Sequence, residues 1–139
     1  MFTHVSLWGI LLSTVAAMAI GGVWYSPLLF GTPWMNAIGL TKKEMKARTN
    51  RALSMLVVVY AVAAYVLSLF TNYYHAYHGG GKIIDALITS TLVWLGFGLT
   101  TILAHGVFEP RDNSVLYINA GNRLVTLTAM GLIIGAFWR

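Results

Sequence analysis

Long apolar runs separated by short polar stretches dominate the pattern of this chain. Four such runs cover residues 5–26, 52–72, 83–107 and 115–138. Each run reaches the roughly 20 residues that a helix needs to cross a hydrocarbon core of about 30 Å. Helices are favoured because backbone groups in lipid must find their hydrogen bonds within the segment. The pattern therefore predicts an all-α membrane protein, a single domain over 1–139 with four transmembrane helices.

The composition supports this prediction. The chain is 58% hydrophobic and only 9% charged, whereas a soluble domain carries roughly 25% charged residues. Too few polar residues are present to cover a water-soluble globule, so we expect the lipid bilayer as the main partner. Cysteine is absent, which excludes disulfides, thiolate metal sites and cysteine nucleophiles.

Positive charge is concentrated in the first loop. Residues 42–51 contain a single acid, Glu44, and five bases, Lys42, Lys43, Lys46, Arg48 and Arg51. Because this charge lies beside an apolar run, we interpret it as a determinant of membrane topology and expect no nucleic-acid partner. The positive-inside rule places the basic loop 42–51 in the cytoplasm and both termini outside.

The end of the first run predicts an elbow. Pro27 cannot form a regular helical hydrogen bond, and Thr32–Pro33 is typical of an N-cap followed by proline at the first helical position. We expect a short helix over 34–40 that lies in the headgroup zone after the first span; the alternative is a half-helix lining a cavity. The spacing of Thr41 and Glu44 predicts a capping box, and hence a helix that continues into the second span.

Small residues recur every four positions along two spans: Gly9, Ser13, Ala17 and Gly21 in the first, and Gly131 and Gly135 in the fourth. Such strips let another helix approach closely. They explain either packing within the four-helix unit or self-association, and we predict a homo-oligomer.

Arg123 is a permanent charge within the fourth run. A charge at this depth costs free energy unless an opposite charge or a polar group pairs with it. Asn119, Asn122 and Thr126 share its helix at spacings of three and four residues, which predicts one polar strip. In one interpretation Arg123 extends back to lipid phosphates or to Glu109. In the other, the strip binds an anionic or polar solute. We expect no carboxylate inside a span, which argues against ion coupling built on buried acids.

The third run carries a second strip of residues three or four apart, formed by Thr91, Trp94, Gly98, Thr101 and His105. Together with Glu109, Thr101 and His105 are added to the candidates for a substrate or ion path. His105 falls near the cytoplasmic end, where it would face Arg123 or Glu109. A single histidine in such a place is more often a packing residue than a proton shuttle, although its pKa near 6.5 allows switching.

His75 and His78 lie among tyrosines on the outer side. A zinc site needs three or four ligands, and only His4 is available as a third. We therefore assign these residues to an interfacial aromatic belt and expect no metal site. Since no activated nucleophile or paired carboxylate can be named, we expect no enzyme and no cofactor.

Several motifs together resemble a known family. The stretch from Gly21 to Gly31 is its opening signature, carried by Trp24, Tyr25, Pro27, Phe30 and Gly31 and followed by Trp34; Gly96–Phe97, Phe108–Glu109 and Ile118–Gly121 are similar to its later signatures. On these residues the chain resembles the small membrane family catalogued as domain of unknown function 1761 (DUF1761). The resemblance implies four spans and a bacterial origin, and it supplies no activity or substrate. The family often has an aromatic residue and a histidine where this chain has Asn122 and Arg123, so Arg123 is a local departure.

These observations lead to two functional hypotheses for a protein of the bacterial cytoplasmic (inner) membrane. The first is a small oligomeric channel or transporter subunit for a small anionic or polar solute. The second is a non-transporting accessory or scaffold protein that acts on a membrane partner protein through helix–helix contacts.

Overall fold

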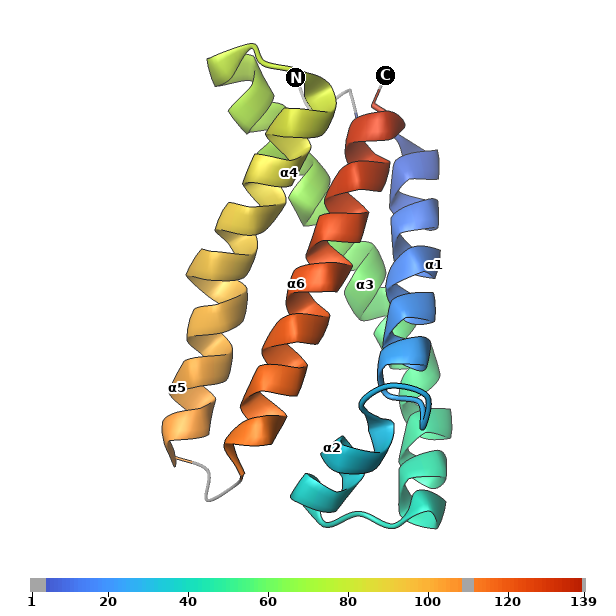
Figure 1. The fold of residues 1–139 in the computed structure, drawn as a ribbon. Coiled ribbons are helices and arrows are strands. Elements are labelled where there is room, and N and C mark those ends of the chain that lie inside the picture. The colour runs from blue at the N-terminus through green and yellow to red at the C-terminus, as the bar shows by residue number, and fades with distance from the viewer. Residues whose placement is uncertain (1–4, 109–111, 139) are drawn as a thin grey trace.

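The computed structural model describes residues 5–108 and 112–138, and these residues form helices and their connections, with no strand among them (Figure 1). The elements are α1 (Leu7–Trp24), α2 (Gly31–Ile38), α3 (Lys42–His78), α4 (Lys82–Val93), the π-helical turn η1 (Trp94–Leu99), α5 (Thr100–Phe108) and α6 (Asn113–Ala136). Because α4, η1 and α5 follow one another without a break, they form one long helix, Lys82–Phe108.

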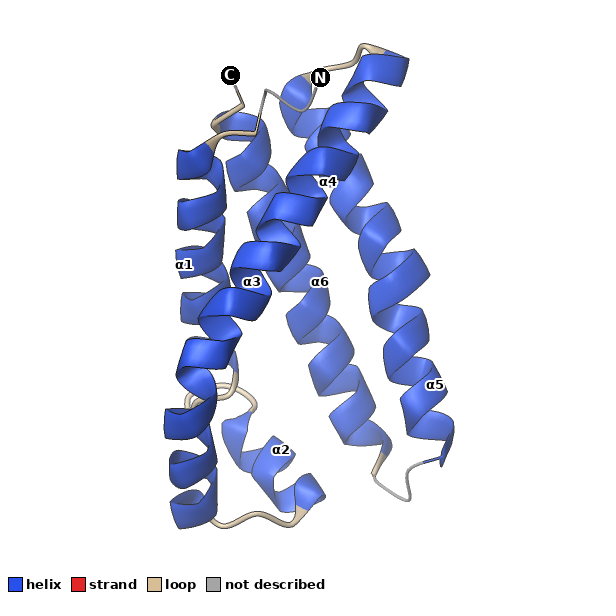
Figure 2. Ribbon diagram, turned by 180° about the vertical axis from the view of Figure 1, so that it is seen from behind, coloured by secondary structure: helices blue, strands red, loops and turns tan. Residues whose placement is uncertain are grey.

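Helix α6 occupies the centre of the bundle. It packs mainly against α1 and α4, and α3 packs against the same two helices from the other side (Figures 1 and 2). The beginning of α1 and the end of α6 lie together at what we call the terminal end. Helix α2 lies at the opposite end, the α2 end, together with the end of α5 and the beginning of α6 (Figure 1).

Three helices are long and apolar enough to cross a membrane: α1, α3 and the continuous helix Lys82–Phe108. The fourth predicted span, 115–138, corresponds to α6, whose 24 residues are sufficient in length. It is less apolar than the others because its first half contains Asn119, Asn122 and Arg123. An all-helical fold compatible with a membrane is thus confirmed, and four membrane crossings remain a prediction.

The predicted capping box is present at the beginning of α3. The Thr41 hydroxyl accepts a hydrogen bond from the Glu44 backbone N–H (3.3 Å), and the Glu44 carboxylate accepts one from the Thr41 backbone N–H (2.9 Å). The prediction of a helix that continues from this point into the second apolar run is confirmed, since α3 extends over 37 residues. At 1.5 Å per residue this corresponds to about 55 Å.

The short helix after α1 exists, but its predicted start is wrong. Helix α2 begins at Gly31 with Phe30 as its N-cap, so Thr32 and Pro33 lie inside its first turn. The chain turns back sharply before α2, and the Gly31 N–H donates to the Ser26 carbonyl (2.9 Å). A side chain at Gly31 would collide with the Tyr25 carbonyl oxygen, so this turn requires glycine.

The small-residue strips are occupied within the chain. Gly9, Ser13 and Ala17 are buried, and the Ser13 hydroxyl donates to the Met130 carbonyl of α6 (3.4 Å). On α6, a Cβ at Gly131 would lie 2.7 Å from Ser90 Oγ, and one at Gly135 would lie 2.8 Å from Ile83 Cα. The strips therefore bring α1 and α4 close to α6. They give no support to self-association, and the homo-oligomer stays a prediction.

The centre of the core lies where α1, α3 and α6 meet, and consists of Ala17, Tyr60, Ala64, Leu67, Met130 and Ile134. These residues lie toward the terminal half of the bundle. At the α2 end the helices are less tightly packed, and none of the residues of α5 is buried.

Candidate functional site

Aromatic side chains from the end of α1, the turn after it and α2 converge on one turn of α6. The side-chain oxygen of Asn119 accepts hydrogen bonds from the Tyr25 hydroxyl (2.8 Å) and from the Trp34 indole N–H (3.1 Å). The Trp24 indole donates to the Ile118 carbonyl (3.0 Å). Three residues of the opening signature thus hold the first half of α6, and we call Trp24, Tyr25, Trp34 and Asn119 the aromatic clamp.

The π-helical turn adds a further bond on the other side of α6. The Trp94 indole donates to the Ala120 carbonyl (3.0 Å), two residues beyond the carbonyl that Trp24 contacts. Gly121 permits the close packing of Trp24 on α6, because a Cβ there would lie 3.0 Å from the Trp24 ring. The similarity of Ile118–Gly121 to a family signature therefore has a physical basis, since these residues receive the indoles.

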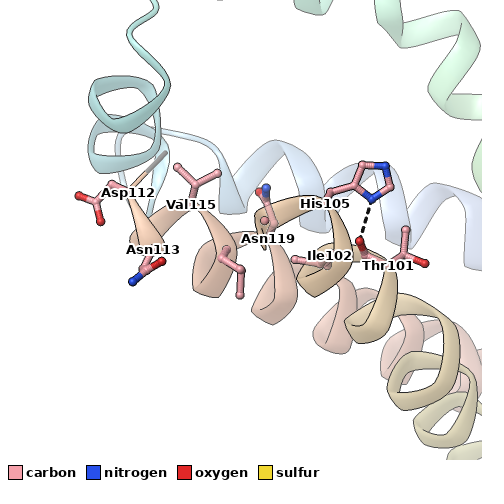
Figure 3. A pocket seen from close by; sticks show the side chains of 9 residues that line it. Thr101, Ile102, His105, Asp112, Asn113, Val115 and Asn119 are labelled. Carbon is pink, nitrogen blue, oxygen red and sulfur yellow. Dashed lines mark hydrogen bonds between the residues drawn. The ribbon is translucent and has the colours of Figure 1, made fainter. Parts of the chain in front are cut away.

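A cavity of about 310 Å³ lies between α5 and α6 at the α2 end. Figure 3 shows side chains from both helices around it, with Thr101 and His105 on α5 and Asn113, Val115 and Asn119 on α6. Its lining is completed by Ile102, Gly106, Asp112 and Leu116. The structure therefore brings together three predicted site residues, Thr101, His105 and Asn119, in one polar cavity.

His105 does not have the partner that we expected. Its Nδ1 lies 2.8 Å from the Thr101 backbone carbonyl (Figure 3). Because a carbonyl can only accept, this contact requires a proton on Nδ1. Glu109, the other expected neighbour, lies outside the described residues.

The predicted polar strip of α6 is divided by burial. Asn122 and Thr126 are only 3% and 2% exposed, whereas the Arg123 side chain is exposed. Among the described residues, Asn122 Nδ2 and Thr126 Oγ1 have no hydrogen-bond partner. Arg123 lies one turn beyond Asn119 on α6.

A pair of polar side chains that the sequence analysis missed lies at the terminal end. Asp85 is 3% exposed, and its Oδ2 is 2.6 Å from Nδ1 of His75. The expectation of no carboxylate inside a span is therefore wrong, because Asp85 is the third residue of the predicted run 83–107. The signal for this pair was a histidine and an acid on either side of a short glycine turn.

His75 and His78 also pack against aromatic rings in this region. His78 stacks on Tyr74 with ring centres 4.1 Å apart, and the His75 ring lies 4.8 Å from that of Trp138. Within residues 5–108 and 112–138 there is no group of three or more metal-ligating side chains. His4, the expected third ligand, lies outside this range.

These features define a class: an all-helical protein with three helices able to cross a membrane, an aromatic clamp on a central helix, and a polar cavity at one end. The chain belongs to the family described as protein of unknown function (DUF1761), whose family model matches residues 8–135. This match confirms the resemblance found in the sequence. No curated protein and no solved structure matches the chain.

Proposed function

We propose that the protein is a small membrane transporter or channel subunit that takes up a small polar solute in the cavity between α5 and α6. The observation that supports this proposal is the convergence of Thr101, His105 and Asn119 on one cavity of about 310 Å³. A volume of this size falls within the range of small-ligand sites. The sequence had nominated the same three residues for a solute path.

The proposal includes four membrane crossings in a bacterial inner membrane, with α6 as the fourth. Helix α3 is about 55 Å long, which exceeds a hydrocarbon core of about 30 Å, so its basic beginning projects from the membrane. With the basic segment 42–51 in the cytoplasm, both termini are outside and the cavity opens toward the cytoplasm. Helix α2 then lies at the inner boundary as the interfacial elbow.

The further path of the solute leads along α6 past Asn122 and Thr126. Their side chains are buried in the structure, and each has a polar atom that no described residue satisfies. Unsatisfied polar atoms inside a membrane are expensive, and a passing solute or water molecule would satisfy them. Trp94 of η1 bonds to Ala120 and Ser90 of α4 lies against Gly131, so Asn122 and Thr126 are level with η1. The path therefore requires η1 to move from α6.

The natural absence of cysteine allows a direct test. Single cysteines at Leu116, Thr126 and Met130 are exposed to a membrane-impermeant thiol reagent, in inverted and right-side-out vesicles. We expect Leu116→Cys to react from the cytoplasmic side and Thr126→Cys to react when the path opens. Met130→Cys is the matched control, because Met130 is fully buried on the same helix. If Leu116→Cys and Thr126→Cys are as protected as the control, no water-filled path exists and the transport proposal fails.

The second candidate is a non-transporting accessory or scaffold protein. It is favoured by the packed interior, because the small-residue strips are filled and Thr126 is only 2% exposed. In this case Arg123 is anchored to lipid phosphate, and the exposed apolar helices contact a membrane partner protein. Uniform protection of the three cysteines, together with capture of a membrane protein by crosslinking at α5, would support this candidate.

A further inference from the structure

We propose that the inner end of the cavity binds an oxyanion of the phosphate type, held by the Asn119 amide group and the Arg123 guanidinium. This inference rests on the cavity of the proposed function and names the chemical group that the cavity recognises. The oxyanion is carried either by a free solute or by the headgroup of an anionic lipid.

The first argument is the orientation of Asn119. An indole N–H can only donate, so the Asn119 atom that Trp34 contacts at 3.1 Å must be the amide oxygen. The same oxygen also accepts from Tyr25 (2.8 Å). The aromatic clamp therefore fixes the amide, and its NH2 group has to direct two donors away from the clamp. Asn119 lines the cavity, so these donors are available to a ligand there.

The second argument is the position of Arg123. It follows Asn119 by four residues, which places both side chains on neighbouring turns of one helix face. Helical side chains tilt toward the N-terminus of their helix, so the long Arg123 side chain extends toward Asn119.

The third argument is charge balance. Arg123 is exposed, and within the described residues no carboxylate forms an ion pair with it. Asp112 is the acid that lines the cavity, and its carboxylate caps α6 by accepting from the Ser114 N–H (3.0 Å). Asp112 precedes Asn119 by seven residues, about 10 Å along the axis, so the acid is at the mouth of the cavity. Arg123 is not one of the lining residues and follows Asn119 by one helical turn, so its charge is beyond the inner end, away from Asp112.

The chemistry of these donors favours an oxyanion. A guanidinium forms paired hydrogen bonds with carboxylate or phosphate oxygens, and the fixed amide adds neutral donors beside it. The Trp24, Trp34 and Trp94 indoles lie around the same turn of α6, so binding at Asn119 is expected to change their fluorescence.

The test uses the full chain, purified in detergent and titrated with inorganic phosphate while tryptophan fluorescence is recorded. A parallel arm reconstitutes the protein in nanodiscs of phosphatidylglycerol or of phosphatidylcholine and measures retained lipid by native mass spectrometry. The variants are Arg123→Gln, Arg123→Lys and Asn119→Asp, which keeps an acceptor oxygen for the clamp and removes the donors. Arg48→Gln is the matched control, since Arg48 is an exposed base of α3 on the same side of the membrane.

We expect Arg123→Gln to weaken phosphate or phosphatidylglycerol binding about tenfold or more, because it removes a charged hydrogen-bond donor. Arg123→Lys should have a smaller effect, Asn119→Asp should also weaken binding, and Arg48→Gln should leave it within about twofold of the parent. Retention of a folded state is checked by circular dichroism for each variant. Binding of phosphate alone identifies a soluble anion, and retention of phosphatidylglycerol alone identifies a lipid headgroup.

The inference is overturned if the parent binds neither probe, or if Arg123→Gln and Arg48→Gln lose affinity equally. These results are distinct from failure of the proposed function. A reactive cysteine at Leu116 without oxyanion binding retains the water-filled cavity and rejects only its selectivity. A protected cysteine at Leu116 rejects the water-filled cavity itself.

Discussion

Replacing Asn119 by leucine tests whether the aromatic clamp holds α6 in place. The two side chains have the same branching and leucine is somewhat larger, so the change creates no empty space and mainly removes an acceptor. Two interhelical hydrogen bonds are lost, from Tyr25 (2.8 Å) and from Trp34 (3.1 Å). Such bonds in membrane proteins contribute about 0.6 kcal/mol on average and at most about 1.7 kcal/mol each. We therefore expect Asn119→Leu to lower the free energy of unfolding by about 1–3 kcal/mol.

The assay is reversible unfolding in mixed micelles with increasing SDS, followed by circular dichroism. A double-mutant cycle with Tyr25→Phe isolates the contact between the two side chains, and we expect a coupling energy of about 0.6 kcal/mol or more. Tyr117→Phe is the matched control, because Tyr117 is on the same helix and is 72% exposed. It should change stability by less than about 0.5 kcal/mol.

The reasoning is refuted if Asn119→Leu unfolds at the same SDS fraction as the control. It is also refuted if the effects of Tyr25→Phe and Asn119→Leu are additive, because residues that share a hydrogen bond must be coupled. In either case packing alone would position α6, and the orientation of the Asn119 amide would no longer be fixed by the clamp.

Two further predictions concern the packing of α6 against α4 and the capping box at the beginning of α3. Gly135→Val should destabilise the protein by about 1–3 kcal/mol in the same SDS assay, because the added Cβ would lie 2.8 Å from the backbone of α4. Gly22→Val is the control and should have a much smaller effect, since a Cβ at Gly22 meets no atom within 4 Å. Equal effects of the two substitutions would contradict the packing argument. The Thr41 hydroxyl and backbone N–H lower the pKa of Glu44 from its ordinary value of 4.5, so Thr41→Val should raise that pKa in an NMR titration, and an unchanged value would contradict the capping box. Because the folded-state pKa is lowered, the stabilisation from ionised Glu44 is present above 4.5 and is lost as the pH falls through the lowered value.

The helices were predictable where one local signal decided the outcome. The capping box at Thr41 and Glu44 defined the start of α3, and the apolar runs located the long helices because length and hydrophobicity are properties of a segment alone. The start of α2 was not predictable in this way. The turn before Gly31 depends on a close backbone approach, and this overrode the local N-cap signal of Thr32–Pro33.

The candidate site was predictable only as a set of residues. Spacing along a helix indicates which side chains share a face, but it does not show which other helix that face meets. Asn119 was therefore nominated without its partners Tyr25 and Trp34, which are more than 80 residues away in sequence. The pairing of His75 with Asp85 was missed for the same reason, since it depends on how α3 and α4 fold back on each other.

The π-helical turn was also missed. Gly96 and Gly98 lie within it, and glycines lower the preference for a regular α-helix. The placement of Trp94 against the Ala120 carbonyl decides where the extra residue is accommodated, and this contact is a tertiary one. No periodicity along the third apolar run contains that information.

Because α3 is long and uninterrupted, it can move as one rigid body. Its 37 residues contain neither proline nor glycine, so the helix has no built-in hinge. Its buried residues begin at Tyr60, and its other end is held by the contact of His75 with Asp85. The part from Lys42 to Tyr60 is about 27 Å long, so a rotation of about 10° around Tyr60 would displace the basic end by about 5 Å. A small rearrangement in the core would thereby become a displacement of positive charge at the α2 end.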